Sequence, residues 1–473
     1  MTTPPRTSVN PPNQPNATKV RQNMKTRSAT ILATIVTALV AFASASDALA
    51  QGTWTTIAPM PTGKVYASGV AFGGEFYVID GYNTSGTWPM APPQVYDPIA
   101  NSWSFKAADP VPRAETAAGV INDKIYVAEG WIQSDSNNPT TALEIYDPAT
   151  DTWTAGAPSL VARGVSASGV INGRLYITGG RGTHWNGLPG SGGESPTLEI
   201  YDAVTNTWST GAPLPVACDF PVGAAINGKF YVVGGGANGA ATANVFIYDP
   251  TTDTWTSGSP MPSPRWLAAG GVINGKLYIT GGNSSYGTNN PVVVYDPITD
   301  SWSTAAAEPT ARSVAAAAAV GGTLFVAGGF DNTFSASLST AEAFTPPRCP
   351  QPKGYWKTNP ALWPVTSLIL GSQTYTQTEL LTILKTAVGT GPKADASLIL
   401  ADQLIAAKLN IANGSDPTPV SGTITDADSL LSAFSGKLPY KVKTSSAIGQ
   451  MMVNDGTTLG NYNNGLLTLV CTP

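Results

Sequence analysis

Short apolar segments with alternating polar positions recur from about residue 54 to residue 346, and tight-turn sequences separate them. The segment Lys229-Phe-Tyr-Val-Val233 is typical, because an Ile-Asn-Gly turn precedes it and a glycine pair follows it. Asn-Gly between two apolar segments is a strong short-range signal for a β-hairpin. Turns of the Ile-Asn-Gly or Ile-Asn-Asp kind occur at residues 121–123, 171–173, 226–228 and 273–275. The pattern predicts an all-β region of short strands.

A longer period organises these strands. Tryptophan recurs at positions 54, 103, 153, 208, 255 and 302, which are 47 to 55 residues apart. Five of these tryptophans follow a Tyr-Asp turn, at residues 96–97, 146–147, 201–202, 248–249 and 295–296. Glycine pairs lie upstream, at residues 179–180, 234–235, 281–282 and 328–329. A period near 50 residues indicates repeated units that pack on one another.

The order of glycine pair, tyrosine and tryptophan resembles the kelch family. The resemblance covers about residues 54–346 and implies a six-bladed β-propeller of four-stranded blades, in which neighbouring blades pack into a ring. We expect the Tyr and Trp side chains to pack between blades. The glycines are expected to let one backbone approach another closely.

The two ends of the repeat region indicate how the ring closes. The sixth block has no Tyr-Asp-Pro…Trp ending and stops at residues 343–346, while Trp54 stands alone before the first block. We therefore expect residues 54–58 to form the outer strand of the last blade, within a propeller of residues 51–346. This strand would protect an open sheet edge.

Propeller topology divides the loops between two faces. The a–b and c–d turns are short and repetitive, whereas the b–c loops and d–a connections on the other face vary, as binding loops do. Aromatic faces beside arginine donors suit a sugar, a carboxylated glycan or an extended peptide. The predicted binding residues on this face are Lys64, Tyr82, Arg113, Glu115, Trp131, Arg163, Arg181, His184, Trp185, Arg265, Trp266, Tyr286, Arg312 and Phe330.

A structural interpretation of the same residues stays open. The recurrent cations of the d–a connections, which Cys218 replaces in the fourth block, would then tie adjacent blades together. Asp80 and Glu129 replace the leading glycine in the first two blocks, and Glu115 lies near them. These three carboxylates suit acid–base catalysis, Ca²⁺ binding or pairing with the arginines.

Composition and charge narrow the function classes. Charged residues make up only 12% of the 473 residues, whereas glycine (49) and proline (39) are abundant. The net charge of −5 gives no electrostatic reason to expect a nucleic-acid partner. Residues 1–50 carry five cations and one acid, so the remaining 20 basic and 29 acidic residues give −9.

Residues 1–50 have the pattern of a signal peptide. Lys25 and Arg27 precede an apolar run from Ile31 to Ala45, and residues 48–50 supply an A-x-A cleavage site. Met24 is an alternative start, and a membrane anchor is the alternative function of the run. We expect a secreted or extracytoplasmic bacterial protein, in the periplasm or on the cell surface, with no membrane span after cleavage.

Three cysteines fit an oxidising compartment. Cys349 and Cys471 bracket the last part of the chain, and a disulfide between them would close a loop of about 120 residues. Cys218 is then left as a small buried hydrophobe.

Residues 347–473 follow a different pattern, which predicts a smaller, mainly helical domain. Apolar residues at helical spacing predict helices near 380–388, 394–412 and 423–434, the last with Thr423 or Thr425 as its N-cap. The Gly-Tyr-Trp-Lys sequence at 354–357 and the run at 401–410 resemble an appended module of secreted bacterial proteins. We expect its tryptophans in the core.

Catalysis has little support in the sequence. Galactose oxidase-like enzymes share the kelch propeller but hold copper with two histidines and two tyrosines, whereas His184 is the single histidine of this chain. No GxSxG, HExxH, P-loop or CxxC motif is present, and we expect no metal or cofactor. Carboxylates, arginine and tyrosine would suffice for a sialic acid mutarotase-like or sialidase-like enzyme.

The leading hypothesis is therefore a secreted, non-enzymatic kelch protein that binds a glycan or an extracellular protein through the b–c and d–a loop face. A carbohydrate-active enzyme that uses carboxylates and arginine near the channel mouth is the first alternative. A structural surface protein is the second.

Overall fold

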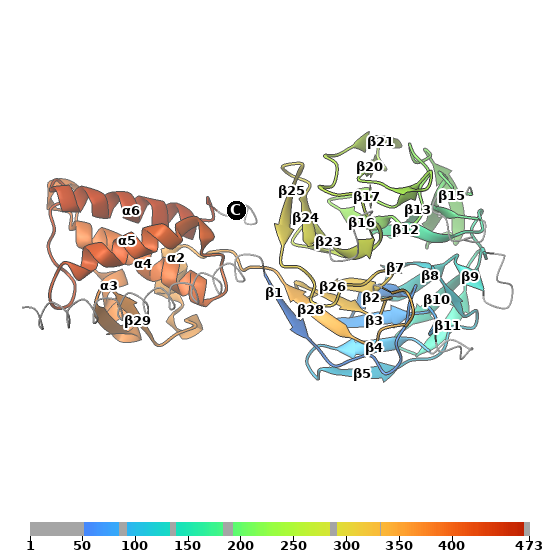
Figure 1. Cartoon of the computed structure of the whole chain (residues 1–473), viewed down its shortest axis with the longest axis horizontal. Helices are drawn as coiled ribbons and strands as arrows, with labels where there is room; N and C mark the ends of the chain where they lie inside the picture. The colour runs from blue at the N-terminus through green and yellow to red at the C-terminus, as the bar shows by residue number, and fades with distance from the viewer. Residues whose placement is uncertain are drawn as a thin grey trace, which may run out of the picture. The chain divides into compact units, whose positions relative to one another are not determined.

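The computed structural model describes residues 52–84, 92–132, 139–182, 193–283, 291–331 and 333–467. The chain forms two compact units, one of residues 51–347 and one that contains residues 348–473. The first unit consists of strands and the second mainly of helices, as Figure 1 shows.

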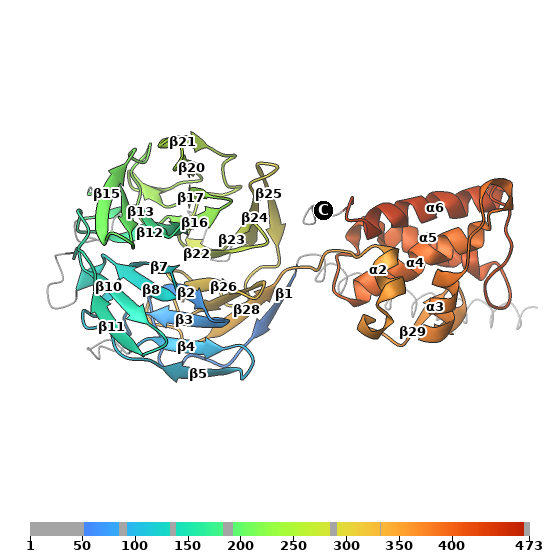
Figure 2. The ribbon, with the colours of Figure 1, turned by 180° about the vertical axis from the view of Figure 1, so that it is seen from behind.

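Six antiparallel four-stranded sheets form the first unit, and Figure 1 and Figure 2 show them arranged radially around one axis. The predicted six-bladed propeller is confirmed. From inside to outside, the blades are β2 (Ser68–Phe72), β3 (Glu75–Ile79), β4 (Gln94–Asp97), β5 (Ser102–Phe105); β7 (Ala117–Ile121), β8 (Lys124–Ala128), β10 (Leu143–Asp147), β11 (Thr152–Ala155); β12 (Gly164–Ile171), β13 (Arg174–Arg181), β14 (Leu198–Asp202), β15 (Thr207–Gly211); β16 (Val222–Ile226), β17 (Lys229–Val233), β20 (Val245–Asp249), β21 (Thr254–Ser257); β22 (Trp266–Ile273), β23 (Lys276–Asn283), β24 (Val292–Asp296), β25 (Ser301–Ala305); and β26 (Ala316–Val320), β27 (Thr323–Ala327), β28 (Ala341–Thr345), β1 (Thr53–Thr56).

The inner strands contact one another in a closed circle around the axis, in the order β2, β7, β12, β16, β22, β26 and back to β2. Small residues permit this approach. A Cβ atom on Gly223 would lie only 2.5 Å from the backbone of Ser168 in the neighbouring blade. Two short two-stranded sheets add to the loop face, β6 (Arg113–Ala114) with β9 (Trp131–Ile132), and β18 (Gly236–Ala237) with β19 (Ala240–Ala241).

The N-terminal strand β1 pairs with β28 and completes the sixth blade, with Trp54 opposite Phe344. The Trp54 indole N–H donates to the Ala306 carbonyl oxygen at 2.9 Å, which joins the fifth and sixth blades. This is the pairing that the isolated Trp54 motif predicts, and the strand itself covers residues 53–56.

The repeated tyrosine and tryptophan form one recurring joint between blades. Tyr146 and Trp153 are cross-strand partners, and the Tyr146 hydroxyl donates to Asp151 at 2.6 Å. The same Asp151 oxygen accepts the backbone N–H of Ala107, whose carbonyl accepts the Trp153 indole N–H at 2.8 Å. Ala107 lies at the end of the preceding blade, so the joint links two blades. The first five blades repeat it, with Asn or Asp as the acceptor.

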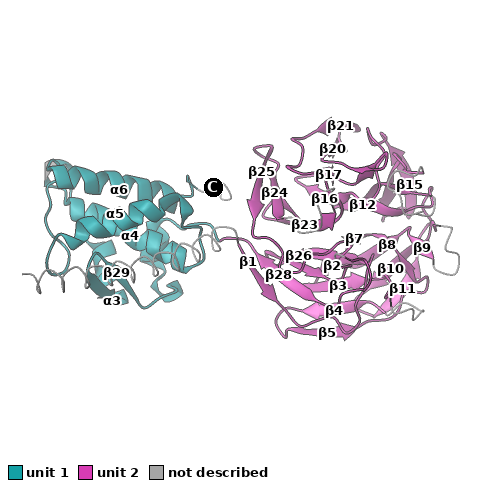
Figure 3. Ribbon diagram, viewed as in Figure 1, with its two compact units in different colours: residues 1–50, 348–473 teal, residues 51–347 magenta. Residues whose placement is uncertain are grey.

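The second unit contains α2 (Lys353–Thr358), η2 (Pro360–Leu362), β29 (Ser367–Leu370), β30 (Gln373–Thr376), α3 (Gln377–Lys385), η3 (Gly391–Lys393), α4 (Ala396–Ala412), η4 (Thr418–Val420), α5 (Ser421–Ser432) and α6 (Ala447–Asn463) (Figure 3). α4 is its central helix and packs against α2, α3, α5 and α6. Trp356 is buried, and its indole N–H donates to Asn410 at 2.9 Å, while Asn410 donates to Asn463 at 3.0 Å. The aromatic opening of this unit therefore belongs to its core.

Cys349 is disulfide-bonded and Cys218 is a buried free thiol. Cys471, the predicted partner of Cys349, and the predicted signal peptide at 1–50 lie outside the described residues. Among the helices that the structure describes, none combines the length and hydropathy needed to cross a bilayer.

Candidate functional site

Each connection into a blade carries one deeply buried residue at an equivalent position: Lys64, Arg113, Arg163, Cys218, Arg265 and Arg312. In the preceding blade, the second residue of the glycine pair, or of Asp-Gly or Glu-Gly in the first two blades, is a glycine with a left-handed backbone. This backbone directs the glycine N–H to the carbonyl oxygen of the buried residue. These hydrogen bonds measure 2.7–3.0 Å and join Gly81 to Arg113, Gly130 to Arg163, Gly180 to Cys218, Gly235 to Arg265, Gly282 to Arg312 and Gly329 to Lys64. They connect every blade to the next.

Most of the buried cations are also paired through their side chains. Arg163 forms salt bridges to Glu129 of the preceding blade at 3.0 Å and to Glu199 of its own blade at 2.9 Å, and all three side chains are fully buried. Arg312 pairs with Glu308 at 2.6 Å and Glu342 at 2.5 Å. Charge-assisted bonds of this kind satisfy a buried guanidinium and fix its position.

The remaining cations of the first two connections are buried as well. Arg113 donates to the Val127 carbonyl oxygen at 2.9 Å and lies 3.9 Å from Asp80. The Lys64 ammonium donates to the Pro92 carbonyl oxygen at 3.1 Å, and burial lowers its pKa to about 8. The prediction that Lys64, Arg113, Arg163 and Arg312 face a ligand is therefore not supported, because their charged groups bind the protein itself.

Arg265 differs from these cations. It is 1% exposed, and one terminal nitrogen donates to the Pro291 carbonyl oxygen at 2.7 Å. Within the described parts of the chain, its Nε and Nη1 atoms have no hydrogen-bond partner, as also holds for Arg113, but Arg113 lies beside Asp80 and Asp109 whereas Arg265 makes no salt bridge. Val293 stands where the second, third and sixth blades have Glu144, Glu199 and Glu342, and burial lowers the pKa of Arg265 to about 10.

Two residues after each buried position, a second set of equivalent residues surrounds the propeller axis. We call them the axial ring: Tyr66, Glu115, Val165, Phe220, Leu267 and Val314. All six have a left-handed backbone, with φ between 49° and 63°, although none is glycine. Non-glycine residues with this backbone are strained, and such residues cluster at binding and catalytic sites.

Backbone hydrogen bonds hold the axial ring together. They run from the N–H of Glu115 to Tyr66, Val165 to Glu115, Phe220 to Val165, Val314 to Leu267 and Tyr66 to Val314, at 2.9–3.1 Å. The main chain therefore fixes each ring residue relative to its neighbours.

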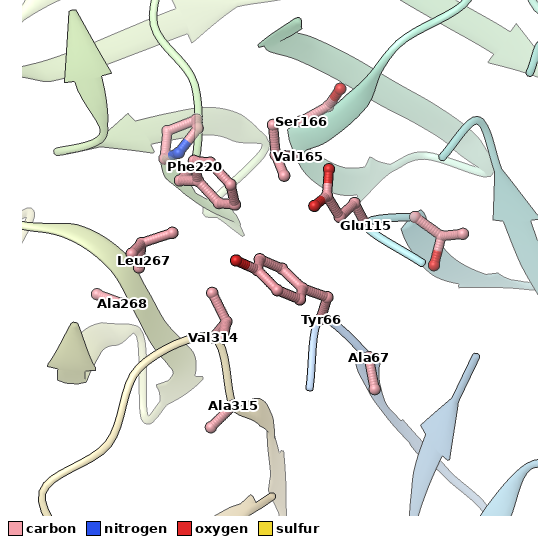
Figure 4. Close-up of a pocket in the computed structure, with 12 residues that line it drawn as sticks. Tyr66, Ala67, Glu115, Val165, Ser166, Phe220, Leu267, Ala268, Val314 and Ala315 are labelled. Carbon is pink, nitrogen blue, oxygen red and sulfur yellow. The ribbon is translucent and has the colours of Figure 1, made fainter. Parts of the chain in front are cut away.

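The axial ring and the residues that follow it line a pocket of about 140 Å³ at the mouth of the central channel, which we call the channel mouth. Figure 4 shows these side chains converging from different strands, with the Tyr66 ring reaching across the opening. Glu115 is the single carboxylate that lines this pocket in the described structure. Val165, Phe220, Leu267 and Val314 make the opposite side apolar.

Glu115 has an unusual electrostatic environment. Burial raises the pKa of its carboxyl to about 7, while Arg181 acts to lower this pKa and Asp219 to raise it. Arg181 forms a salt bridge with Asp219 at 2.7 Å, and its guanidinium lies 5.2 Å from the centre of the Phe220 ring. Among the described residues, the Glu115 carboxylate itself makes no salt bridge or hydrogen bond. The opposite charge near Glu115 is that of Arg181, which is already paired with Asp219.

Aromatic side chains form the rim of the channel mouth. Tyr82 stacks on Tyr66 with ring centres 5.6 Å apart, and Phe330 meets the same ring edge-on at 5.9 Å. Trp266 packs against Phe220 at 6.1 Å. The Trp131 indole covers Gly164, where an added Cβ would also lie 3.2 Å from the Cβ of Glu115. Tyr82, Trp131 and Trp266 are all partly exposed.

The structure thus brings together six of the predicted site residues: Tyr82, Glu115, Trp131, Arg181, Trp266 and Phe330. It also adds Tyr66 and Phe220, which the sequence analysis missed. The repeat alignment contains the signal that identifies them. Tyr66 and Phe220 lie two residues after Lys64 and Cys218, as Glu115 lies two residues after Arg113. His184, Trp185 and Tyr286 lie outside the described residues.

The comparisons agree with the repeat pattern. The family model "KLHDC2/KLHL20/DRC7 Kelch-repeats domain" matches residues 67–265 and 156–329, and the model "Kelch motif" matches residues 311–348. The solved structure of YjhT is similar, with 17% sequence identity, a TM-score of 0.53, and coverage of 60% of this chain and 95% of YjhT. The similarity to YjhT concerns the fold. Since the kelch-repeat model matches more than half of the chain, this protein belongs to the kelch-repeat family.

Proposed function

We propose that this protein is an exported binding protein that holds a glycan at the channel mouth of its kelch propeller. The predicted signal peptide at 1–50 supports export. The partly exposed rings of Tyr82, Trp131 and Trp266 around one carboxylate support binding and carry the proposal. Aromatic faces offer apolar contact to a sugar ring, and a carboxylate accepts hydrogen bonds from its hydroxyls. A pocket with a few polar groups in an apolar wall is typical of a ligand site.

A glycan array probed with residues 51–473 tests this function, with Trp131→Ala and Phe105→Ala variants in parallel. Phe105 is an aromatic residue that is 50% exposed on the outer strand β5, so its variant controls for loss of a surface aromatic. We expect Trp131→Ala to weaken binding about tenfold, as for a central aromatic contact, and Phe105→Ala to leave it unchanged. Absence of any bound glycan, or equal effects of both variants, would overturn the proposal.

One observation favours a catalytic alternative. A carboxyl group with a pKa of about 7 can both accept and donate a proton near neutral pH, and Glu115 and Tyr66 are neighbours in the axial ring. NMR of hexose and sialic acid anomers incubated with the protein tests this function. Faster anomer exchange that Glu115→Gln abolishes would establish an enzyme, and a rate equal to buffer would exclude it.

A further inference from the structure

We infer that the group held inside the channel mouth carries a positive charge, namely a primary ammonium. Given the proposed function on which this inference rests, the ligand is a glycan that contains an amino sugar with a free amine. The inference names the chemistry of the ligand, and it follows from the charges, walls and size of the pocket.

Glu115 is the carboxylate that lines the pocket in the described structure. Glu115 makes no salt bridge among the described residues, and its nearest cation, Arg181, is committed to Asp219 at 2.7 Å. The connection cations of the neighbouring blades are bound elsewhere, since Arg163 pairs with Glu129 and Glu199. The Glu115 side chain is partly exposed where it lines the pocket, so its carboxylate is accessible to a ligand, and a ligand cation would supply the partner that it lacks.

The walls suit the same ligand. Tyr66 and Phe220 line the pocket, Tyr82 packs on Tyr66, Trp266 packs on Phe220, and Trp131 lies over Gly164 beside Glu115. Aromatic faces attract cations, and quaternary and methylated ammonium groups are bound by such aromatic cages. The Arg181 guanidinium already lies 5.2 Å from the centre of the Phe220 ring, so this wall accepts a cation within the protein.

The channel mouth is small. Its volume of about 140 Å³ suits an ammonium and its adjoining carbons, and a further space of about 170 Å³, which shares Thr116 and Ser166 with it, continues from the pocket. The rest of the glycan would then lie over the aromatic rim. A single amino-sugar unit therefore supplies the charged group, and the chain beyond it supplies the aromatic contacts.

A matched pair of oligosaccharides tests the inference. Titration calorimetry would compare a β-1,4-linked glucosamine tetramer with its fully N-acetylated counterpart, in which a neutral acetamide replaces each ammonium. We expect the wild-type protein to bind the free amine at least about tenfold more tightly, as for a hydrogen bond to a charged group. Glu115→Gln should abolish this preference. Glu75→Gln, a change of the same charge on the opposite face, should retain it, and thermal melting would verify that both variants fold.

The pH dependence gives an independent readout with a fixed sign. Lowering the pH from 7.5 to 5.5 protonates the Glu115 carboxyl, whose pKa is about 7, so binding of glucosamine should weaken. The ligand amine becomes more cationic over the same range and cannot cause that loss. Asp219, with a pKa of about 6, and Arg181 also act electrostatically on Glu115, Tyr66 and Tyr82 are influenced by its charge, and Glu194 acts on Asp219. The pH response that remains in Glu115→Gln belongs to Asp219.

The outcomes separate this inference from the proposed function. Equal affinity for both tetramers, unchanged in Glu115→Gln, overturns the ammonium inference and leaves a glycan-binding protein. Binding of Nα-acetyl-lysine amide at Glu115 without binding of either tetramer supports the ammonium inference and overturns the glycan function. Absence of binding to all three probes overturns both.

Discussion

At the scale of single residues, a side chain in one strand is matched to a side chain in the connection before it. In the third and sixth blades, the third strand from the axis carries a glutamate, Glu199 or Glu342. The connection into the same blade provides Arg163 or Arg312, and each pair forms a buried salt bridge. In the fourth blade the equivalent residue is Phe246, and the connection provides Cys218. Arg265 breaks this correspondence, because the equivalent position in its blade is Val293.

Supplying the missing acid should therefore stabilise the fifth blade. Val293→Glu is expected to pair with Arg265 as Glu199 pairs with Arg163. A double-mutant cycle with Arg265→Met should give a favourable coupling of about 1–3 kcal/mol in the free energy of unfolding. Chemical denaturation of the four proteins measures this coupling.

The fourth blade offers the control for this prediction. Phe246→Glu places the same acid at the equivalent buried position, but its connection residue, Cys218, provides no cation. This variant should be strongly destabilised, because a buried charge without a partner is costly. A coupling of zero between Val293→Glu and Arg265→Met would contradict the prediction.

The sequence alone identified Glu115, Trp131 and Arg181, but it missed Tyr66 and Phe220, for a physical reason. Whether a ring residue points to the axis depends on its left-handed backbone, with φ of 57° at Tyr66 and 51° at Phe220. Local sequence does not predict this conformation for aromatic or β-branched residues, because they rarely adopt it. The repeated arginines, by contrast, were predicted as binding residues because they recur at equivalent positions. They recur because they form contacts within and between blades.

At the scale of secondary-structure elements, the sixth blade depends on a strand from the other end of the unit. β1 covers the edge of β28, and Trp54 packs against Phe344 with ring centres 5.2 Å apart. This blade has Phe344 where the others have a tyrosine with its Asx acceptor. The Trp54 indole is thus the part of the repeated joint that this blade retains.

Removing that joint should open the ring at one point. Trp54→Ala is expected to lower the free energy of unfolding by about 2 kcal/mol, through the lost hydrogen bond and the lost packing of a partly exposed ring. Deleting residues 51–58 should lower the melting temperature much further and promote aggregation through the exposed edge of β28. Circular dichroism melts measure both, with Phe105→Ala as the surface control. An unchanged melting curve after the deletion would disprove this account of ring closure.

The helical unit shows where pattern reasoning succeeds and fails. Apolar spacing predicted helices that correspond to α3, α4 and α5, although α5 begins at Ser421 without a side-chain cap, so the predicted caps Thr423 and Thr425 are wrong. Helix α6 was missed because its sequence contains three glycines and several Thr and Asn residues, which are weak helix formers. One of these glycines, Gly456, packs against α4, so tertiary contact stabilises the helix.

At the scale of the whole molecule, two separate cores divide the chain. The core of the second unit contains Trp356, Trp363 and the apolar side chains of α4, whereas the cores of the propeller lie between and within its blades. The disulfide-bonded Cys349 belongs to the second unit, and the free Cys218 to the propeller. Redox chemistry and unfolding should therefore be linked in one unit and independent in the other.

Calorimetry of residues 51–473 should show two transitions, of which reduction lowers one. Breaking the Cys349 disulfide is expected to destabilise the second unit by about 2–4 kcal/mol, the usual contribution of a disulfide. The propeller transition should not move, and Cys349→Ser should reproduce the effect of the reductant. Cys218→Ala serves as the control, since it should leave the response to reductant intact. A single transition that shifts as a whole would contradict this independence.

The axial ring has a consequence for how such a protein changes its ligand. Its hydrogen bonds join main-chain atoms alone, so the frame persists whichever side chains the six positions carry. Each repeat thus contributes one side chain to the channel mouth, and that side chain can change without a change in the backbone frame. Exchanging Val165 or Val314 for Asn or Asp would add a polar group to the channel mouth. It would also relieve backbone strain, because Asn and Asp tolerate a left-handed backbone. New specificities are therefore reachable one substitution at a time, without rebuilding the propeller.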